Sequence, residues 1–172
     1  FDVQFGAIAP MLGIRPSNTL ATLAPHTADV GGSTDIGDFL TVAPIIEGIN
    51  LHVLAAPPAP MDLSVLHPEI ASQILSTLRR RFDVVVVDLP TQLTDASLAA
   101  FQLCELLLLI CEPEMLSVRS CRQMVELLTK DPTVGKPAAQ TKIVLNKVRA
   151  KSLIKSSDVI ELFPDMVVGQ LP

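Results

Sequence analysis

The stretch that decides the predicted fold runs Phe82-Asp83-Val84-Val85-Val86-Val87-Asp88-Leu89-Pro90. Its four consecutive valines predict a strand from Val84 to Val87, because β-branched side chains favour extended backbone. The run does not alternate with polar residues, so both faces of this strand are expected to be covered. Strands of that kind are typical of parallel sheets with helices on both sides.

Working outward, the rest of the chain repeats this pattern. Further strands are predicted at Leu51–Ala55, Leu106–Ile110, Lys142–Leu145 and, more weakly, Met166–Val168. Helical periodicity separates them, over Glu69–Arg81, Asp95–Leu103, Leu116–Lys130 and Ser152–Phe163, and a short helix is expected at Asp35–Leu40. The alternation predicts an α/β fold with three layers, in which a mostly parallel sheet is flanked by helices. We assign residues 1–172 to a single domain.

The composition limits the classes of function that are expected for this chain. Apolar residues make up 49% of the chain and aromatic residues 3%, so the core is expected to be aliphatic. The net charge of −5 provides no basic field for a phosphate backbone, and no nucleic-acid partner is expected. The cluster Arg79-Arg80-Arg81 fits the last turn of a helix, where cations complement the helix dipole, better than a contact with nucleic acid or an acidic partner. The three cysteines are odd in number and fit no metal site, which favours buried free thiols.

Candidate chemistry lies where the predicted strands end, since ligands of open parallel sheets bind beyond the carboxyl ends of the strands. The residues at these positions are 2–6, 57–58, 88–91, 112–114 and 146–147. Asp88 ends the valine strand in the manner of a Walker B aspartate, which holds Mg²⁺ beside phosphates. A solvated aspartate at the end of a strand is the alternative for Asp88, because an apolar run followed by Asp is common.

Several segments, taken in order, carry a family resemblance. They are Asp2-Val3-Gln4-Phe5-Gly6 with Leu12-Gly13, Val53–Pro57, Phe82–Pro90, Pro113, Glu114, Ser117 and Arg119, Val144–Val148, and Val168-Gly169 with Pro172. Together they resemble the MinD/ParA family of deviant P-loop ATPases, and most of all its CpaE/TadZ group, which is linked to type IV pilus assembly. The resemblance covers nearly the whole chain and implies a P-loop NTPase-like fold of the SIMIBI type.

The resemblance also implies roles for three residues and a cofactor, ATP with Mg²⁺. Asp88 would be the Mg²⁺ ligand, and Asp2 matches the switch I aspartate that helps to position the attacking water. Asn146 matches the asparagine that recognises the adenine edge, which suits an amide that can donate and accept hydrogen bonds at once. From the residues alone, the favoured interpretation of Asp2 is a helix or turn cap, and that of Asn146 is a polar residue that ends a strand.

Three departures from the family pattern shape the expected activity. No Lys-Gly-Gly-x-Gly-Lys-Thr/Ser phosphate loop occurs in the sequence, and Thr91-Gln92 stands where switch II usually has a glycine. The family's last helices have no counterpart. We therefore expect a fragment that is incomplete at the N-terminus and lacks the phosphate loop and the first strand. Alone it is expected to be inactive, to bind no measurable ATP, and to be poorly soluble or oligomeric.

The predicted function follows from the resemblance. The parent is expected to be a cytoplasmic, homodimeric CpaE/TadZ-like localisation factor that binds ATP and is a candidate Mg²⁺-dependent ATPase. Its expected partners are pilus or secretion assembly proteins, and its recruitment to the inner face of the membrane or to a cell pole requires no transmembrane segment. Two alternatives stay open. One is a non-catalytic scaffold with the same fold, and the other is a ParA-like partitioning ATPase.

Overall fold

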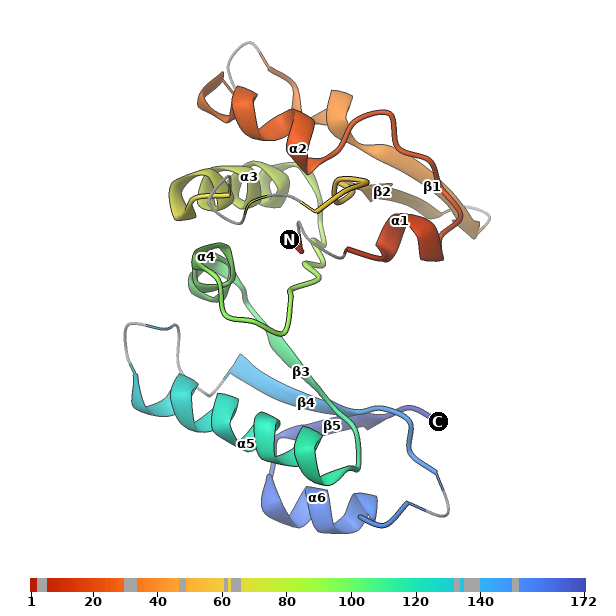
Figure 1. Cartoon of the computed structure of the whole chain (residues 1–172), viewed down its shortest axis with the longest axis vertical. Coiled ribbons are helices and arrows are strands. Elements are labelled where there is room, and N and C mark those ends of the chain that lie inside the picture. Colours follow the sequence, from red (N-terminus) through yellow and green to blue (C-terminus); the bar gives the residue numbers. More distant parts are fainter. Residues whose placement is uncertain are drawn as a thin grey trace. The chain divides into compact units, whose positions relative to one another are not determined.

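The computed structural model describes residues 1–2, 6–29, 34–46, 49–60, 62, 66–131, 134, 140–149 and 152–172. The chain divides into two compact units, which we call unit 1 (Phe1–Leu103) and unit 2 (Cys104–Pro172). Figure 1 shows the elements of both units. The assignment of residues 1–172 to a single domain stays a prediction.

Unit 1 contains a β-hairpin and several helices. In chain order its elements are α1 (Ile8–Met11), α2 (Leu20–Leu23), η1 (Ala24–Asp29), η2 (Ile36–Phe39), β1 (Thr41–Ile46), β2 (Ile49–Val53), α3 (Pro68–Arg81) and α4 (Asp95–Leu103). The predicted strand at 51–55 is β2, shifted by two residues, and its partner β1 runs antiparallel to it. The short helix expected at 35–40 is the 3₁₀ helix η2. It begins where the Asp35 carboxylate accepts a hydrogen bond of 2.8 Å from the Gly37 N–H.

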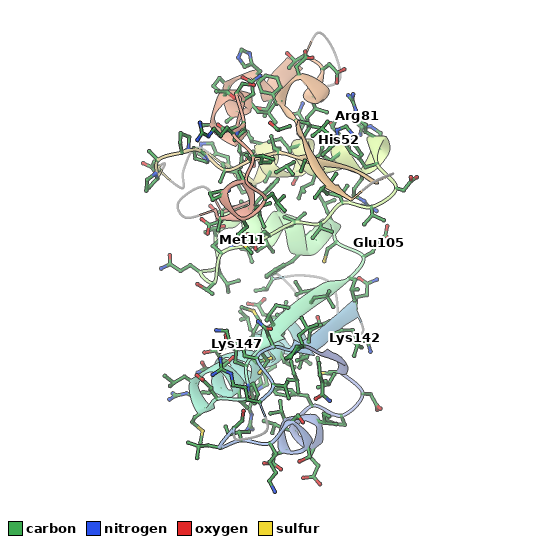
Figure 2. All side chains as sticks on the ribbon, turned by 90° about the vertical axis from the view of Figure 1, so that its right-hand side faces the viewer. Met11, His52, Arg81, Glu105, Lys142 and Lys147 are labelled. Carbon is green, nitrogen blue, oxygen red and sulfur yellow. The ribbon has the colours of Figure 1, made fainter. Side chains whose placement is uncertain are left out.

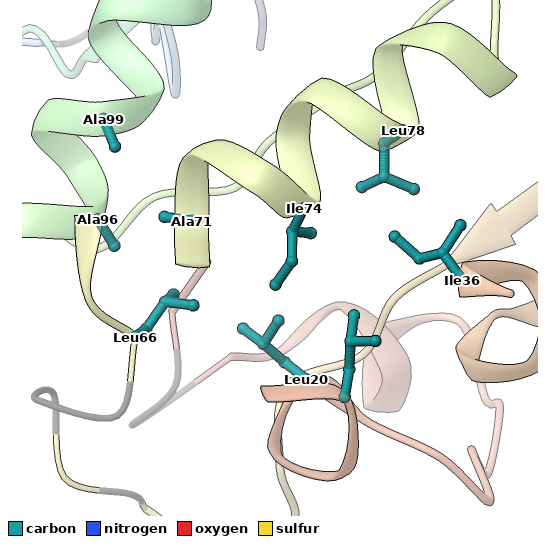
Figure 3. Packing of buried hydrophobic residues seen from close by; sticks show 9 residues of the cluster. Leu20, Ile36, Leu66, Ala71, Ile74, Leu78, Ala96 and Ala99 are labelled. Atoms are coloured by element: carbon teal, nitrogen blue, oxygen red, sulfur yellow. The ribbon is translucent and has the colours of Figure 1, made fainter. Parts of the chain in front are cut away.

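The core of unit 1 lies between α3 and the elements before it. Pro68 occupies the first turn of α3, where a missing N–H costs nothing, and Ile74 and Leu78 face the core. Figure 3 shows Ile74 directed toward Leu20, with Ala71 of α3 facing the alanines of α4. Small side chains at the α3–α4 contact let the two helices approach closely. Both predicted helices are confirmed.

The arginine cluster at the end of α3 stabilises unit 1. The Arg79 guanidinium donates a hydrogen bond of 3.1 Å to the main-chain carbonyl of Leu103, the last residue of α4. Arg81 forms an ion pair with the Asp35 carboxylate at the start of η2. The Gly37 N–H and the Arg81 side chain both lower the pKa of Asp35. The cluster therefore ties α3 to two neighbouring elements, in keeping with its predicted place in the last helical turn.

The prediction of a strand from Val84 to Val87 is wrong. This segment is extended, yet within the described residues it belongs to no sheet. Phe82 and Val85 pack against the core of unit 1, whereas Val84 and Val86 are 78% and 89% exposed. Four valines favour extended backbone, but a strand also needs hydrogen-bonding neighbours, and those are set by other parts of the chain.

Unit 2 contains a parallel three-stranded sheet. Its elements are β3 (Leu107–Cys111), α5 (Met115–Lys130), β4 (Thr141–Leu145), α6 (Ser156–Leu162) and β5 (Val167–Gln170). The strand order is β3-β4-β5, with Leu109 opposite Ile143 and Ile143 opposite Val167. The predicted α/β class with parallel strands and flanking helices is confirmed. The helix expected at 152–163 is shorter, because α6 starts only after Lys155, where Asp158 accepts a hydrogen bond from the Lys155 N–H.

One face of this sheet holds the core of unit 2. Cys111, Ile143 and Leu145 are fully buried there against Cys121 of α5 and Val159 of α6. On the opposite face the exposed apolar residues are Leu108 (46%), Ile110 (58%) and Val168 (58%). The expectation that β3 is covered on both faces is therefore not met within the described residues, since α5 and α6 both pack on one side. A continuous apolar run does not show which elements pack on the two faces of a strand.

Candidate functional site

Two of the predicted site residues, Asp2 and Asp88, lie in unit 1 near the Phe1 amino group. The amino group of Phe1 donates a hydrogen bond to the main-chain carbonyl of Asp88. Burial lowers the pKa of this amino group, and the nearby carboxylates of Asp88 and Asp2 act in the opposite direction. Both carboxylates thus lie within electrostatic reach of the same atom. Asp88 is exposed and Asp2 is half-buried, so their oxygens can meet a ligand from solvent.

Gly6 makes a close backbone contact with Ala56, which follows the end of β2. A Cβ atom at Gly6 would lie 2.4 Å from the Ala56 Cβ and 2.8 Å from the Asp2 carbonyl oxygen. Only glycine fits such an approach. The main-chain carbonyl of the preceding residue, Ala55, accepts a hydrogen bond of 2.8 Å from the Leu20 N–H. The backbone at residues 55–56 is therefore also tied to α2. Gly6 therefore helps to place Asp2.

The third predicted residue, Asn146, follows β4 in unit 2. Its main-chain N–H donates a hydrogen bond of 2.9 Å to the Cys111 carbonyl, so the ends of β3 and β4 stay paired there. The Val148 N–H donates to the Leu171 carbonyl at 3.0 Å, and the Leu171 N–H donates to the Leu145 carbonyl at 2.8 Å. Asn146 is half-buried at this edge. Its backbone is thus fixed at the carboxyl ends of the three strands.

An ion pair next to Asn146 was not predicted. The Lys147 ammonium lies 2.7 Å from a Glu112 carboxylate oxygen, and it joins the loops after β4 and β3. Ser117 of α5 supports this pair, because its hydroxyl accepts a hydrogen bond of 2.9 Å from the Glu112 N–H. Figure 2 shows Lys147 and Lys142 at different places along unit 2, since Lys142 lies near the start of β4 and Lys147 lies beyond its end. The sequence predicts that both Glu112 and Lys147 lie at this edge of the sheet, but it does not predict that they form an ion pair.

Lys147 also has a left-handed backbone, with φ of 55°. That conformation costs a residue with a side chain about 1–2 kcal/mol. We expect Lys147→Gly to leave the free energy of unfolding within about 1 kcal/mol of the original, because relief at φ > 0 offsets the lost ion pair. Lys142→Gly is the matched control. It is expected to destabilise by about 1 kcal/mol or more, since glycine weakens a strand interior.

The comparison of Lys147→Gly with Lys142→Gly is measured by urea denaturation of each variant. A loss of stability in Lys147→Gly that equals or exceeds that in Lys142→Gly would contradict this expectation. It would mean that the ion pair with Glu112 stabilises the protein by more than the left-handed backbone of Lys147 destabilises it.

The carboxylates in unit 1 can be tested for their fit to Mg²⁺. Mg²⁺ is bound in proteins through one or two carboxylates plus phosphates and waters. Asp2 and Asp88 each supply a carboxylate, which suits that donor set. Within the described ranges no group of three or more His, Cys, Asp or Glu residues could hold a metal ion.

The predicted buried free thiols are found in unit 2. Cys111 on β3 and Cys121 on α5 are both buried, Cys104 is half-buried, and none of the three forms a disulfide. Burial raises the pKa of Cys111, and burial together with the neighbouring Cys111 raises the pKa of Cys121 to about 12. Since the thiolate is the reactive form, these two thiols are protected in the folded protein.

Thiol labelling should separate the three cysteines. At pH 8 we expect one fast reaction with a disulfide reagent, at Cys104, and two more reactions only after unfolding in urea. Cys104→Ser is expected to remove the fast phase. Three thiols that react at one rate in the folded protein would contradict the burial of Cys111 and Cys121.

The fold of this chain also occurs in a known protein. No family model matches the chain. No curated protein matches it either. Among solved structures, it is similar to the crystal structure of a ParA family ATPase from Chlorobium tepidum TLS, with a TM-score of 0.77 and 17% identity over 99% of this chain. The chain has the fold of that ATPase. It spans 64% of the length of the ATPase chain.

The candidate residues are divided between the two units. Asp2 and Asp88 lie in unit 1, and Asn146 lies in unit 2. Ser117 belongs to the segment 113–119 that carries part of the family resemblance. Its hydroxyl accepts a hydrogen bond from the Glu112 N–H. None of the described helices is long and apolar enough to cross a membrane.

Proposed function

We propose that this chain is the nucleotide-binding region of a CpaE/TadZ-like localisation factor for pilus assembly or secretion. The observation that carries the proposal is the ParA-type fold of the chain, in which the carboxylates of Asp2 and Asp88 both act on the Phe1 amino group. The likeness to a ParA family ATPase supports ATP as the ligand.

In this proposal each residue has a separate task. Asp88 holds the cation through its carboxylate, and Asp2 orients the attacking water. Asn146 recognises the adenine edge from a backbone that its N–H ties to the Cys111 carbonyl. When bound, Mg²⁺ supplies neutralisation of the charge on the phosphates. The protein that carries this chain would act as a cytoplasmic homodimer that binds assembly proteins and is recruited to the membrane or a cell pole.

A non-catalytic scaffold with the same fold is the second candidate. Thr91 and Gln92, both exposed in unit 1, favour it because they replace the glycine of switch II that approaches a γ-phosphate. The scaffold would bind assembly proteins without a nucleotide cycle. The Mg²⁺ dependence of ATP binding, with Asp88 as the varied position, separates the two candidates.

A further inference from the structure

The valine run Val84–Val87 is an extended segment whose main chain lacks hydrogen-bonding partners within the described part of the chain. Its side chains alternate between exposed and half-buried positions, which is the two-residue period of an extended backbone. Among the described residues, no main-chain N–H or carbonyl of the run forms a hydrogen bond. A row of unpaired main-chain groups is a template on which another strand can pair.

The run is held in place on one side and open on the other. Val85 packs against the core of unit 1. At the carboxyl end of the run, the Phe1 amino group donates a hydrogen bond to the Asp88 carbonyl. Val84 and Val86, on the other side of the backbone, are 78% and 89% exposed. The run therefore presents an apolar edge that is anchored to the core of unit 1.

The chemistry of the run defines the partner that fits it. Valine side chains favour a second extended segment, because β-branched side chains pack well across neighbouring strands. Apolar side chains of that segment would cover Val84 and Val86. Asp83 and Asp88 are exposed directly before and after the run, so a cation at each end of the partner would meet a carboxylate. Pairing with a second copy of the run would instead gather four aspartates around one pair of strands.

We propose that Val84–Val87 is a docking edge for an extended apolar peptide segment with a basic residue at each end. The segment would add to the run as a strand, with main-chain hydrogen bonds supplying affinity and alternate side chains supplying specificity. This edge needs neither ATP nor Mg²⁺, so it goes beyond the proposed nucleotide function and is tested separately from it.

The test is a titration of the full chain, without Mg²⁺, with the acetylated and amidated peptide Lys-Val-Thr-Val-Thr-Lys, followed by NMR. We expect one saturable site per chain, with the largest shifts at the amides of Val84–Val87. Successive N–H groups of a strand point to opposite edges, so N-methylation of the two valines or of the two threonines removes donors from one edge only. One methylated peptide is expected to bind about tenfold more weakly and the other within about threefold. Equal binding of the two would overturn the strand pairing.

Matched variants test the side chains. Val86→Ser is expected to weaken binding by about threefold or more, because it removes an apolar cross-strand contact. Val42→Ser makes the same change at a valine that is 52% exposed but already pairs with His52 of β2, and it should leave affinity within about twofold. Thermal melts verify that both variants are folded.

The charge requirement is tested with a peptide in which glutamates replace both lysines. It is expected to bind about fivefold more weakly or worse, since repulsion replaces attraction at both ends of the run. Equal binding of the two peptides would overturn the basic character of the partner. Self-association of the chain that Val86→Ser abolishes in sedimentation experiments would also overturn the proposal, because the partner would then be a second copy.

Discussion

Asp88→Asn is expected to abolish the Mg²⁺ dependence of ATP binding in the protein that carries this chain together with a phosphate loop. A neutral amide loses the charge that attracts the cation, while its shape is retained. Losing one charged ligand contributes on the order of 1.5–3 kcal/mol, which corresponds to a tenfold or larger rise in the dissociation constant. Affinity for ATP without Mg²⁺ should stay within about twofold.

The matched control is Asp83→Asn. Asp83 is exposed at the start of the same extended segment, so the variant makes the same chemical change away from Asp88. It should retain the full Mg²⁺ dependence. Calorimetric titrations with ATP, with and without Mg²⁺, measure all three proteins. A normal Mg²⁺ response in Asp88→Asn would remove Asp88 from the site and favour the scaffold.

Ile74→Ala is expected to have the largest effect on stability. Ile74 is fully buried on α3 among the side chains of the unit 1 core (Figure 3). Truncation leaves a cavity that the surrounding helices cannot close, and such changes cost about 2–5 kcal/mol. Because small proteins are stable by only about 5–15 kcal/mol, a large share of the stability of unit 1 would be lost.

Ile8→Ala serves as the control for Ile74→Ala. Ile8 begins α1 and is 38% exposed, so the same truncation leaves no closed cavity. We expect it to change the free energy of unfolding by less than about 1 kcal/mol. Urea denaturation followed by circular dichroism measures both variants. Similar losses for the two would show that the core of unit 1 does not depend on tight packing around Ile74.

Local sequence determined the helices well. Apolar spacing along α3 and α5 predicts which face is buried, and Pro68 predicts where α3 begins. Strands β3 and β4 were located to within one residue, because short apolar runs between helices leave few other assignments. Since parallel strands end at a common edge, Glu112, Asn146 and Lys147 could be placed at that edge from sequence alone.

Sequence could not supply the partners of these segments. Val84–Val87 has the composition of a buried strand, yet Val84 and Val86 are exposed, because burial depends on neighbours that the valines do not choose. The antiparallel pairing of β2 with β1 was missed for the same reason. The left-handed backbone at Lys147 also escaped prediction, since lysine has no intrinsic preference for that conformation.

The sequence by itself determined an aliphatic α/β chain, the position of most helices, and the residues available at the strand ends. Only the tertiary structure decided that Glu112 pairs with Lys147 and that Arg81 pairs with Asp35. The physical reason is that periodicity and propensity act over a few neighbouring residues, whereas contacts between charges depend on the path of the whole chain.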